Sequence, residues 1–327
     1  MSEENKPCRV SVLYTTHRPE TVDVLFEEMS RHEAVFLEEP PAADFVDMLE
    51  GRVPIDDYLM NRDDEYPEFA RRSCRTFQAL HRNGILLFQV EPYMEELIGI
   101  HEFFAEGAGP SDLTPATARH RVYMAEHLAT RALLDFYRVS LAGTFVETVA
   151  AVRAFARADA DRFRLRDEMR ADALAEVVGD YGSPAVEAGY MHALLWRLLK
   201  RRAAADARVR PVYLMREQMA EAGARRRNLG PGDVLTLHYL FHPAKDGSVL
   251  DLLAARSLMY AKLLEKEEMI GRAGQFPHLK NEMETNRITD VLSYEDCRRL
   301  YPLIRRSSTA KARRIVLGYM GRQGKRS

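Results

Sequence analysis

The chain has 327 residues, of which 46% are hydrophobic and 29% charged, and its formal net charge is −2. These values are typical of a globular protein with ample core material, organised as one elaborated domain or two intimate ones. The balanced charge excludes a strong overall attraction to nucleic acid or to an acidic membrane. Cys8, Cys74 and Cys297 stand far apart without a CxxC pair, which argues against a disulfide framework or a cysteine-ligated zinc site.

The sequence pattern carries no signal for export or membrane insertion. Its first ten residues, MSEENKPCRV, are polar and acidic, whereas a secretory signal has a basic start and an apolar core. No apolar run approaches the roughly 18–20 residues needed to cross a bilayer. Because isolated thiols also indicate a reducing compartment, we expect a cytoplasmic protein without a membrane partner.

From Arg9 to about Tyr93, short apolar runs alternate with amphipathic stretches. This alternation is typical of parallel strands that are joined and covered by helices. Helices are expected between the strands, and Asn83-Gly84 provides the stop signal of the last one. The predicted strands are Arg9–Thr15, Ala34–Leu37 and Ile85–Val90, and the predicted helices lie near 22–29, 42–50 and 66–82.

Residues 95–182 are rich in Ala, Leu, Arg and Glu and predict a helical segment, after which a second α/β portion begins. The predicted fold class is therefore α/β, with a mainly parallel central sheet built from two similar halves and a large helical insertion between them. The expected divisions are 1–94, 95–182, 183–304 and a tail over 305–327. In the second half we expect strands at Ala185–Ala188, Val212–Met215 and Asp233–Phe241, and a helix at Ala193–Lys200.

The tail from Arg305 to Ser327 is locally basic, with eight Lys or Arg residues and no Asp or Glu. Such tails are usually solvated and partly disordered, so flexibility is the first expectation. A role in contacting RNA or lipid is the alternative, although charge alone does not establish it.

Four apolar runs end in residues that can bind metals or move protons. They are VSVLYTTH at His17, AVFLEEP at Glu38 and Glu39, ILLFQVEPY at Glu91, and PAVEAGYMH at His192. Because the carboxyl ends of parallel strands lie along one edge of a sheet, where open α/β folds place their ligands, we expect these side chains to share one cleft. Taken singly, each has a plainer interpretation, since a strand-end histidine often makes only structural hydrogen bonds and Glu38-Glu39 is consistent with a solvated strand exit.

Two histidines and one or two carboxylates form a reasonable site for a divalent metal such as zinc or manganese. We predict His17, Glu38 and His192 as ligands, with one position left for water. The metal would lower the pKa of that water, and Glu39 or Glu91 would accept its proton and pass it to a leaving group. This is the chemistry of a metal-dependent hydrolase.

The most distinctive stretch runs from Arg164 to Leu199. We expect Arg166 and Asp167 to open a helix, and Gly189 to allow close backbone approach or positive φ just before His192. Arg166 is the candidate for holding a substrate carboxylate or stabilising an oxyanion, and the helix that starts near Ala193 is expected to aim its amides at an anion. A salt bridge from Arg166 to a neighbouring acid, Asp167 or Glu168, is an equally good interpretation.

The order of these motifs resembles a known superfamily. Its members include the TraB and PrgY pheromone-shutdown proteins, Tiki proteases, ChaN haem-binding proteins and erythromycin esterases. The resemblance covers about Arg9 to Leu199 and rests on short motifs in a shared order. These motifs are the strand ending in His17, acidic Glu38-Glu39, Glu91, the R-D-x-x-M segment Arg166 to Met169, and the G-x-x-H element Gly189 to His192.

One departure from the superfamily concerns its first G-x-x-H element, where this chain has Tyr14 in place of glycine. The change leaves the expected fold intact and affects the expected metal geometry and substrate approach. For some members, the resemblance implies metal-dependent hydrolysis of a peptide, ester or amide. For others it implies ligand binding without hydrolysis, and fold membership does not choose between them.

The other histidines give weaker signals. His238 and His242 lie on or after the predicted strand Asp233–Phe241, which would place both on one face, and a structural or substrate-lining role is favoured over a metal pair. His101, His120 and His127 fall in the helical segment, where they could line a pocket for a planar ligand such as haem.

Three functional hypotheses follow. The leading one is a cytoplasmic metal-dependent hydrolase acting on a small-molecule or peptide substrate. The second is a non-catalytic ligand-binding or regulatory protein of the same fold, with haem or a peptide in the cleft. The third is an RNA-associated scaffold that uses the basic tail, which the near-neutral remainder argues against, and a homo-oligomer is left open.

Overall fold

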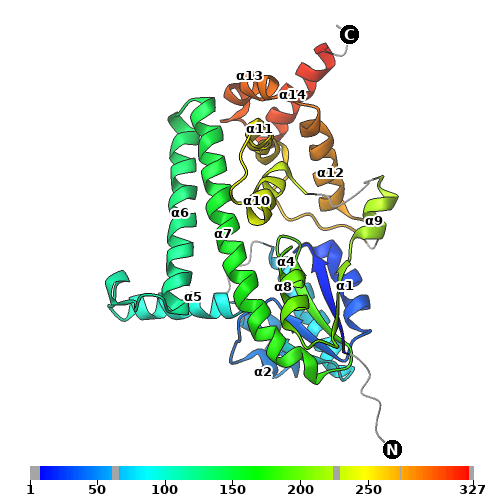
Figure 1. Ribbon diagram of the computed structural model, residues 1–327. Coiled ribbons are helices and arrows are strands. Elements are labelled where there is room, and N and C mark those ends of the chain that lie inside the picture. Colours follow the sequence, from blue (N-terminus) through cyan, green and yellow to red (C-terminus); the bar gives the residue numbers. More distant parts are fainter. Residues whose placement is uncertain (1–7, 61–65, 224–228, 273, 324–327) are drawn as a thin grey trace, which may run out of the picture. The chain divides into compact units, whose positions relative to one another are not determined.

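The computed structural model describes residues 8–60, 66–223, 229–272 and 274–323 (Figure 1). Contacts group the chain into two units, and each is described by itself. Unit 1 comprises Met1–Tyr123, Phe163–Gln218 and Glu268–Gln275, and unit 2 comprises Met124–Arg162, Met219–Glu267 and Phe276–Ser327.

Unit 1 contains one sheet of five parallel strands in the order β3-β2-β4-β1-β5. The predicted α/β class with a parallel sheet is therefore confirmed. Strand β4 comes late in the sequence and pairs between β1 and β2, with Gly189 opposite Thr15 and Val186 opposite Phe36. The strands are β1 (Arg9–Thr15), β2 (Ala34–Leu37), β3 (Leu86–Gln89), β4 (Pro184–Gly189) and β5 (Arg208–Tyr213).

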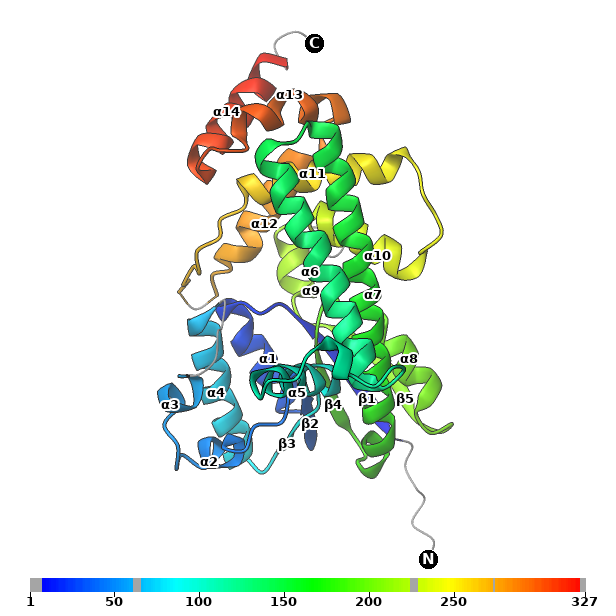
Figure 2. The same cartoon turned by 90° about the vertical axis from the view of Figure 1, so that its left-hand side faces the viewer.

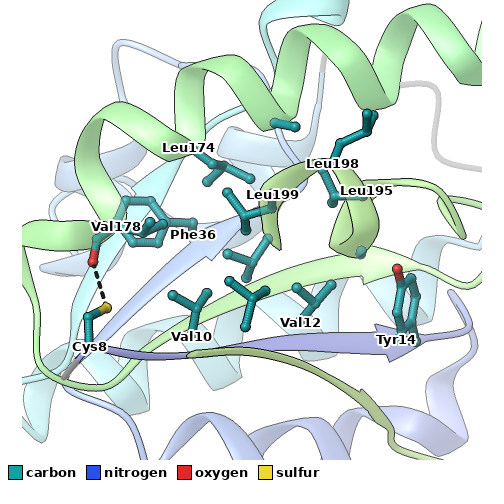
Figure 3. Packing of buried hydrophobic residues seen from close by; sticks show 14 of the residues in the cluster. Cys8, Val10, Val12, Tyr14, Phe36, Leu174, Val178, Leu195, Leu198 and Leu199 are labelled. Carbon is teal, nitrogen blue, oxygen red and sulfur yellow. Dashed lines mark hydrogen bonds between the residues drawn. The ribbon is translucent and has the colours of Figure 1, made fainter. Parts of the chain in front are cut away.

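One face of the sheet packs against the end of α7 (Phe145–Val177) and against α8 (Leu195–Arg202). Figure 3 shows Val10, Val12 and Tyr14 of β1 pointing together toward these helices, as expected from the two-residue period of a strand. Helix α7 contributes Leu174 and helix α8 contributes Leu195, Leu198 and Leu199 to this core, and Val178 joins it from the turn directly after α7.

The opposite face carries Leu13 of β1 and Leu37 of β2, and it is covered by α1, α2 and α4. Helix α4 is preceded by Tyr66 and has Pro67 in its first turn, where the missing amide donor costs nothing. It ends at Asn83 and Gly84, and the φ of +82° at Gly84 explains why glycine stands there. The helices of this part are α1 (Val22–Met29), α2 (Phe45–Leu49), α3 (Ile55–Leu59), α4 (Pro67–Arg82) and α5 (Pro92–Ala105).

Unit 2 consists of helices in the residues that the structure describes. Its largest feature is a hairpin formed by the parts of α6 and α7 that belong to it, which lie side by side in both views (Figures 1 and 2). The helices are α6 (Ala118–Ala142) with α7, α9 (Arg216–Glu221, shared with unit 1), α10 (Pro231–Phe241), α11 (Ser248–Leu263), α12 (Pro277–Asp290), α13 (Tyr294–Ile304) and α14 (Thr309–Gln323).

The predicted strand Asp233–Phe241 is wrong, because these residues form most of α10. Pro231 occupies the first turn, and the Asp233 carboxylate accepts the backbone N–H of Gly230 at 2.9 Å, which starts the helix. His238 and His242 consequently lie one turn apart at the end of a helix, with ring centroids 5.5 Å apart, and do not share a strand face.

The second half of the chain supplies only β4 and β5 to the sheet, and the described residues after Tyr213 contain helices and no further strand. The strand predicted at Val212–Met215 occurs earlier, at Arg208–Tyr213. The tail also differs from the flexible segment expected, since residues 309–323 form α14 and bury Ala312 and Val316.

Two further expectations concern membranes and thiols. Within the residues described, no helix is long and apolar enough to cross a membrane. Cys8, Cys74 and Cys297 are all buried, and none of them forms a disulfide.

Candidate functional site

The sheet order places the four predicted strand ends next to one another. Strands β3, β2, β4 and β1 are consecutive neighbours, and they are followed by Glu91, Glu38, His192 and His17 respectively. The sequence separates these residues by up to 175 positions, and the parallel pairing brings them to one edge of unit 1.

His192 is held between two carboxylates. Its Nδ1 lies 2.5 Å from Asp167 Oδ1 and its Nε2 lies 2.9 Å from Glu38 Oε1, while its side chain is 3% exposed. Burial alone would lower the pKa of His192, but Glu38 and Asp167 outweigh it and raise the pKa to about 9. His192 is therefore an imidazolium at neutral pH and donates both N–H groups.

Both carboxylate oxygens of Glu38 are engaged. Oε2 accepts the backbone N–H of Gly189 at 2.5 Å, and Oε1 lies near His192 and, at 3.4 Å, the Arg166 guanidinium. Burial would raise the pKa of Glu38, but His192, with Arg170 and Arg166, holds it well below the usual range. Glu38 is thus a carboxylate of fixed orientation.

Glu91 belongs to the same cluster of charged side chains and is fully buried. Its Oε2 is 3.5 Å from Arg166 and 3.8 Å from Arg170, and Arg170 also donates its Nε–H to the Val90 carbonyl at 2.8 Å. Counted by formal charge, Glu38, Glu91 and Asp167 balance Arg166, Arg170 and His192. The cluster is therefore neutral as a whole, as buried charges generally require.

His17 and Glu39 line a cavity of about 180 Å³ beside this cluster. The His17 ring stacks on Phe69 of α4, with centroids 5.3 Å apart, and the residue is exposed to solvent. Desolvation by the surrounding walls lowers the pKa of His17, and this effect outweighs the opposing effect of Glu38. His17 is therefore neutral at pH 7, in contrast to His192.

Glu187 lies on the floor of the same cavity, and its position was not predicted from the sequence. It is a buried residue within the otherwise apolar strand β4, and its Oε2 accepts a long hydrogen bond of 3.4 Å from the Glu38 backbone N–H. Burial, with the nearby Glu39 and Glu38 carboxylates, raises the pKa of Glu187 to about 8. Glu187 is the one charged residue in the segment PAVEAG, and this was the sequence signal that could have identified it as a site residue.

Asp167 and Arg170 were also missed as site residues. The prediction that Arg166 and Asp167 open a helix is wrong, because both lie well inside α7. Arg166 and Arg170 are four residues apart in RDEMR and so occupy one face of that helix. This spacing was the sequence signal that could have identified Arg170. Arg166 pairs with Glu38 and Glu91 and does not line the cavity.

Two smaller expectations also have outcomes. The helix that follows His192 does direct an amide at an anion, because Leu194 N–H donates to Asp167 Oδ2 at 3.1 Å. Gly189 does not have positive φ, and its role is close approach to Glu38. Tyr14, which replaces the first glycine, donates its hydroxyl to the His192 carbonyl at 3.0 Å and stacks on Tyr213.

Comparison with known proteins identifies one relative of unassigned function. No family model and no solved structure matches the chain. It is 33% identical over 291 residues to an uncharacterized protein of Archaeoglobus fulgidus, a match that covers 89% of this chain and 97% of that protein. The chain belongs to the family of this archaeal protein. A match over 291 of the 327 residues includes parts of both units.

The site as it stands does not fit the metal predicted for this member of the family. A side-chain carbon on Gly189 would lie 3.5 Å from Glu38 Oε2, 3.7 Å from His192 Cδ2 and 3.9 Å from His17 Cε1, so the three predicted ligands do meet. However, both histidines present ring carbons there, and each nitrogen of His192 already faces a carboxylate. In the described residues, no group of three or more His, Cys, Asp or Glu side chains is arranged to hold a metal ion.

Haem does not fit the cavity either. The volume of the cavity, about 180 Å³, is below the roughly 300–1,000 Å³ that is usual for pockets that bind drug-sized ligands. His101 lies on α5, and His120 and His127 lie on α6, and none of them lines this cavity.

Unit 2 contains an ionic cluster of its own, on the surface. Arg153 pairs with Asp246, donates to Asp251 at 2.5 Å and reaches the Tyr239 hydroxyl at 3.1 Å. Arg157 lies over the Tyr239 ring, 4.6 Å from its centroid. Arg153, Arg157, Tyr239 and Asp251 line a cavity of about 300 Å³, and no histidine is found among the described residues of its lining.

Proposed function

We propose that the chain is a hydrolase that cleaves an ester, amide or peptide bond in the 180 Å³ cavity, with His17 as its general base. The observation that carries this proposal is the contrast between the two strand-end histidines. His192 is protonated and locked between carboxylates, whereas His17 is neutral, partly exposed and beside the cavity. A neutral imidazole near its working pH is the usual acceptor of a proton from attacking water.

In the proposed reaction, His17 takes a proton from water as the water oxygen bonds to the substrate carbonyl carbon. The imidazolium then returns that proton to the leaving oxygen or nitrogen as its bond to carbon breaks, so that atoms and charges balance. The fixed carboxylate of Glu38, which lines the cavity, stabilises the transient charge on His17. Glu39 also lines the cavity, where it accepts a hydrogen bond from Gln89 Nε2 at 2.9 Å, and in this proposal it contacts the substrate.

The remaining predicted residues have supporting roles in this proposal. Glu91 and Arg166 do not line the cavity, and they hold Glu38 through the charge network. His192 and Asp167 act in the same way as positioning residues. No step uses a metal, because both ring nitrogens of His192, one of the three predicted ligands, already face carboxylates.

The experiment measures hydrolysis of 4-nitrophenyl butyrate and of propionyl 4-nitroanilide by the full chain after dialysis against a chelator. We expect turnover to survive the chelator. His17→Gln should lower kcat/KM by about 10²–10⁴, the usual contribution of a general base. His242→Gln is the matched control, because His242 is an exposed histidine in unit 2.

Equal losses in the two variants, or no loss in either, would contradict the assignment of His17. Saturable ligand binding with no turnover would favour the second hypothesis, a binding protein of this fold.

A further inference from the structure

The wall of the cavity formed by the strand ends is acidic. Glu38, Glu39 and Glu187 all contribute carboxyl groups to it, and none of the described residues that line it is lysine or arginine. The cations of the neighbouring cluster face Glu38 and Glu91 and do not line the cavity. Arg18 stacks on the ring of Tyr66 with its guanidinium carbon 4.1 Å from the centroid, and it too is outside the lining.

The opposite wall belongs mainly to α4 and is apolar and aromatic, with Phe69 and Phe77 among its members. It holds one polar side chain that is left without a partner. Ser73 is 5% exposed, lines the cavity, and its hydroxyl makes no hydrogen bond. An unsatisfied buried hydroxyl costs on the order of 1–3 kcal/mol, so its presence in a cavity wall indicates a ligand that provides a donor or acceptor.

We propose that this cavity binds the alkylammonium group of the substrate, held by Glu39 and Glu187 on the acidic wall and by the Ser73 hydroxyl and aromatic rings on the other. Carboxylates combined with aromatic faces are the surroundings in which proteins recognise ammonium groups. The proposal rests on the proposed function, because it takes the cavity to be the substrate site, and it narrows the substrate to an ester or amide that carries an amine.

The size of the cavity agrees with such a group. A cavity of about 150 Å³ accommodates benzene, so one of about 180 Å³ has room for an ammonium group with a short alkyl chain. A larger substrate would place only this part inside.

The protonation of Glu187 also agrees with a site that binds a cation. Glu38 has its counterions in the neighbouring cluster, whereas burial with Glu39 and Glu38 keeps the pKa of Glu187 high. An ammonium group would supply a counterion and would favour ionised Glu187, so binding at neutral pH releases protons to solution.

The test uses n-butylammonium as the probe, with butyrate and butan-1-ol as its anionic and neutral counterparts, each titrated into the full chain by calorimetry or NMR. We expect butylammonium to bind at least about tenfold more tightly than either counterpart, since only it can pair with a carboxylate. Equal or tighter binding of butyrate or butan-1-ol, or no saturable binding of butylammonium, overturns the proposal.

Variants locate the binding. Glu39→Gln keeps the shape of the side chain and should weaken butylammonium binding about tenfold, whereas Glu106→Gln, at an exposed residue outside the cavity, should leave it unchanged. Ser73→Ala should weaken binding and at the same time raise the Tm of the ligand-free protein, because it removes an unsatisfied hydroxyl. Unchanged affinity in both Glu39→Gln and Ser73→Ala overturns the proposal.

A pair of substrates separates this proposal from the hydrolase assignment. Alanine 4-nitroanilide and propionyl 4-nitroanilide differ by the amine alone, and the first should have the higher kcat/KM. Hydrolysis without that preference, in a protein that also fails to select butylammonium, overturns this inference and leaves the hydrolase. Selective binding of butylammonium without hydrolysis of either compound supports the cation site and contradicts the hydrolase.

Discussion

The two units of this protein each contain a cluster of arginine and acidic side chains, and the clusters differ chiefly in their contact with water. In unit 1, Asp167, His192 and Glu38 have side chains that are 0%, 3% and 7% exposed. In unit 2, Arg153, Asp251 and Asp246 are 20%, 40% and 57% exposed. The two clusters therefore contain similar ion pairs, but those of unit 1 are shielded from water and those of unit 2 are not.

This difference determines what each cluster can do. Away from water, charges interact strongly and cannot be left unpaired, so the unit 1 cluster fixes which groups carry protons. Water and salt screen the unit 2 cluster, and a pair there contributes about 0–1 kcal/mol. The four predictions that follow test this comparison in order of decreasing effect.

The largest effect is expected for Asp167→Ala, which removes one partner of the buried His192 imidazolium. Breaking a buried pair in this way costs about 3–5 kcal/mol. Urea unfolding at pH 7 should show a loss of this size in the free energy of unfolding. A loss below about 1 kcal/mol would mean that the unit 1 cluster is no stronger than a surface pair.

The second prediction concerns pH. Glu187 ionises near 4.5 when unfolded and at about 8 when folded, and His192 titrates near 6.5 when unfolded and at about 9 when folded. Between pH 6.5 and 8 the folded state therefore binds more protons at both groups, and stability falls as pH rises, on the order of 2 kcal/mol per pH unit. The lowered pKa of His17 acts in the opposite sense, and its effect is greatest below pH 6.5, where the unfolded histidine is protonated.

Urea unfolding at several pH values in this window measures the slope. Glu187→Gln should reduce it by roughly half, because only His192 then remains coupled to folding. A stability that is flat or rises over this range in the unchanged protein would be inconsistent with these protonation states.

The third prediction is smaller. Tyr14→Phe removes the hydroxyl that donates to the His192 carbonyl and keeps the stacking on Tyr213. Loss of one such hydrogen bond costs about 1 kcal/mol, which chemical unfolding can measure. If Tyr14→Phe is at least as stable as the unchanged protein, the tyrosine does not support the segment that carries His192.

The smallest effect is expected for Asp246→Ala in unit 2. Arg153 keeps Asp251 and the Tyr239 hydroxyl, and the lost pair is exposed to solvent, so unfolding should change by less than about 1 kcal/mol and less still at high salt. A salt-insensitive loss as large as that of Asp167→Ala would remove the distinction between the clusters.

The sequence predicted the parallel sheet and the shared edge because strand periodicity and strand ends are local signals. Residues 9–15, 34–37 and 184–189 are apolar runs, and pairing alone brings His17, Glu38 and His192 together. The sequence did not predict that Glu38 and His192 neutralise each other within an ionic cluster. This charge neutralisation depends on Asp167 and Arg170, which belong to α7 and are distant in sequence from the ends of β1 and β2.

The misassigned strand has a different cause. Six of the nine residues in Asp233–Phe241 are apolar, and in so short a run the periodicity does not separate a buried strand from a buried helix. Pro231 and Asp233 are the sequence signals that mark the start of this helix. They lie in GPGD, which was interpreted as a turn before a strand.

The central claim is that the two strand-end histidines hold opposite protonation states at neutral pH. The most direct measurement is an NMR titration of the imidazole signals of His17 and His192, assigned with His17→Gln and His192→Gln. The account predicts that His192 remains an imidazolium until the pH approaches about 9, whereas His17 is neutral at pH 7. Titration of both rings together near 6.5, the ordinary histidine value, would contradict it.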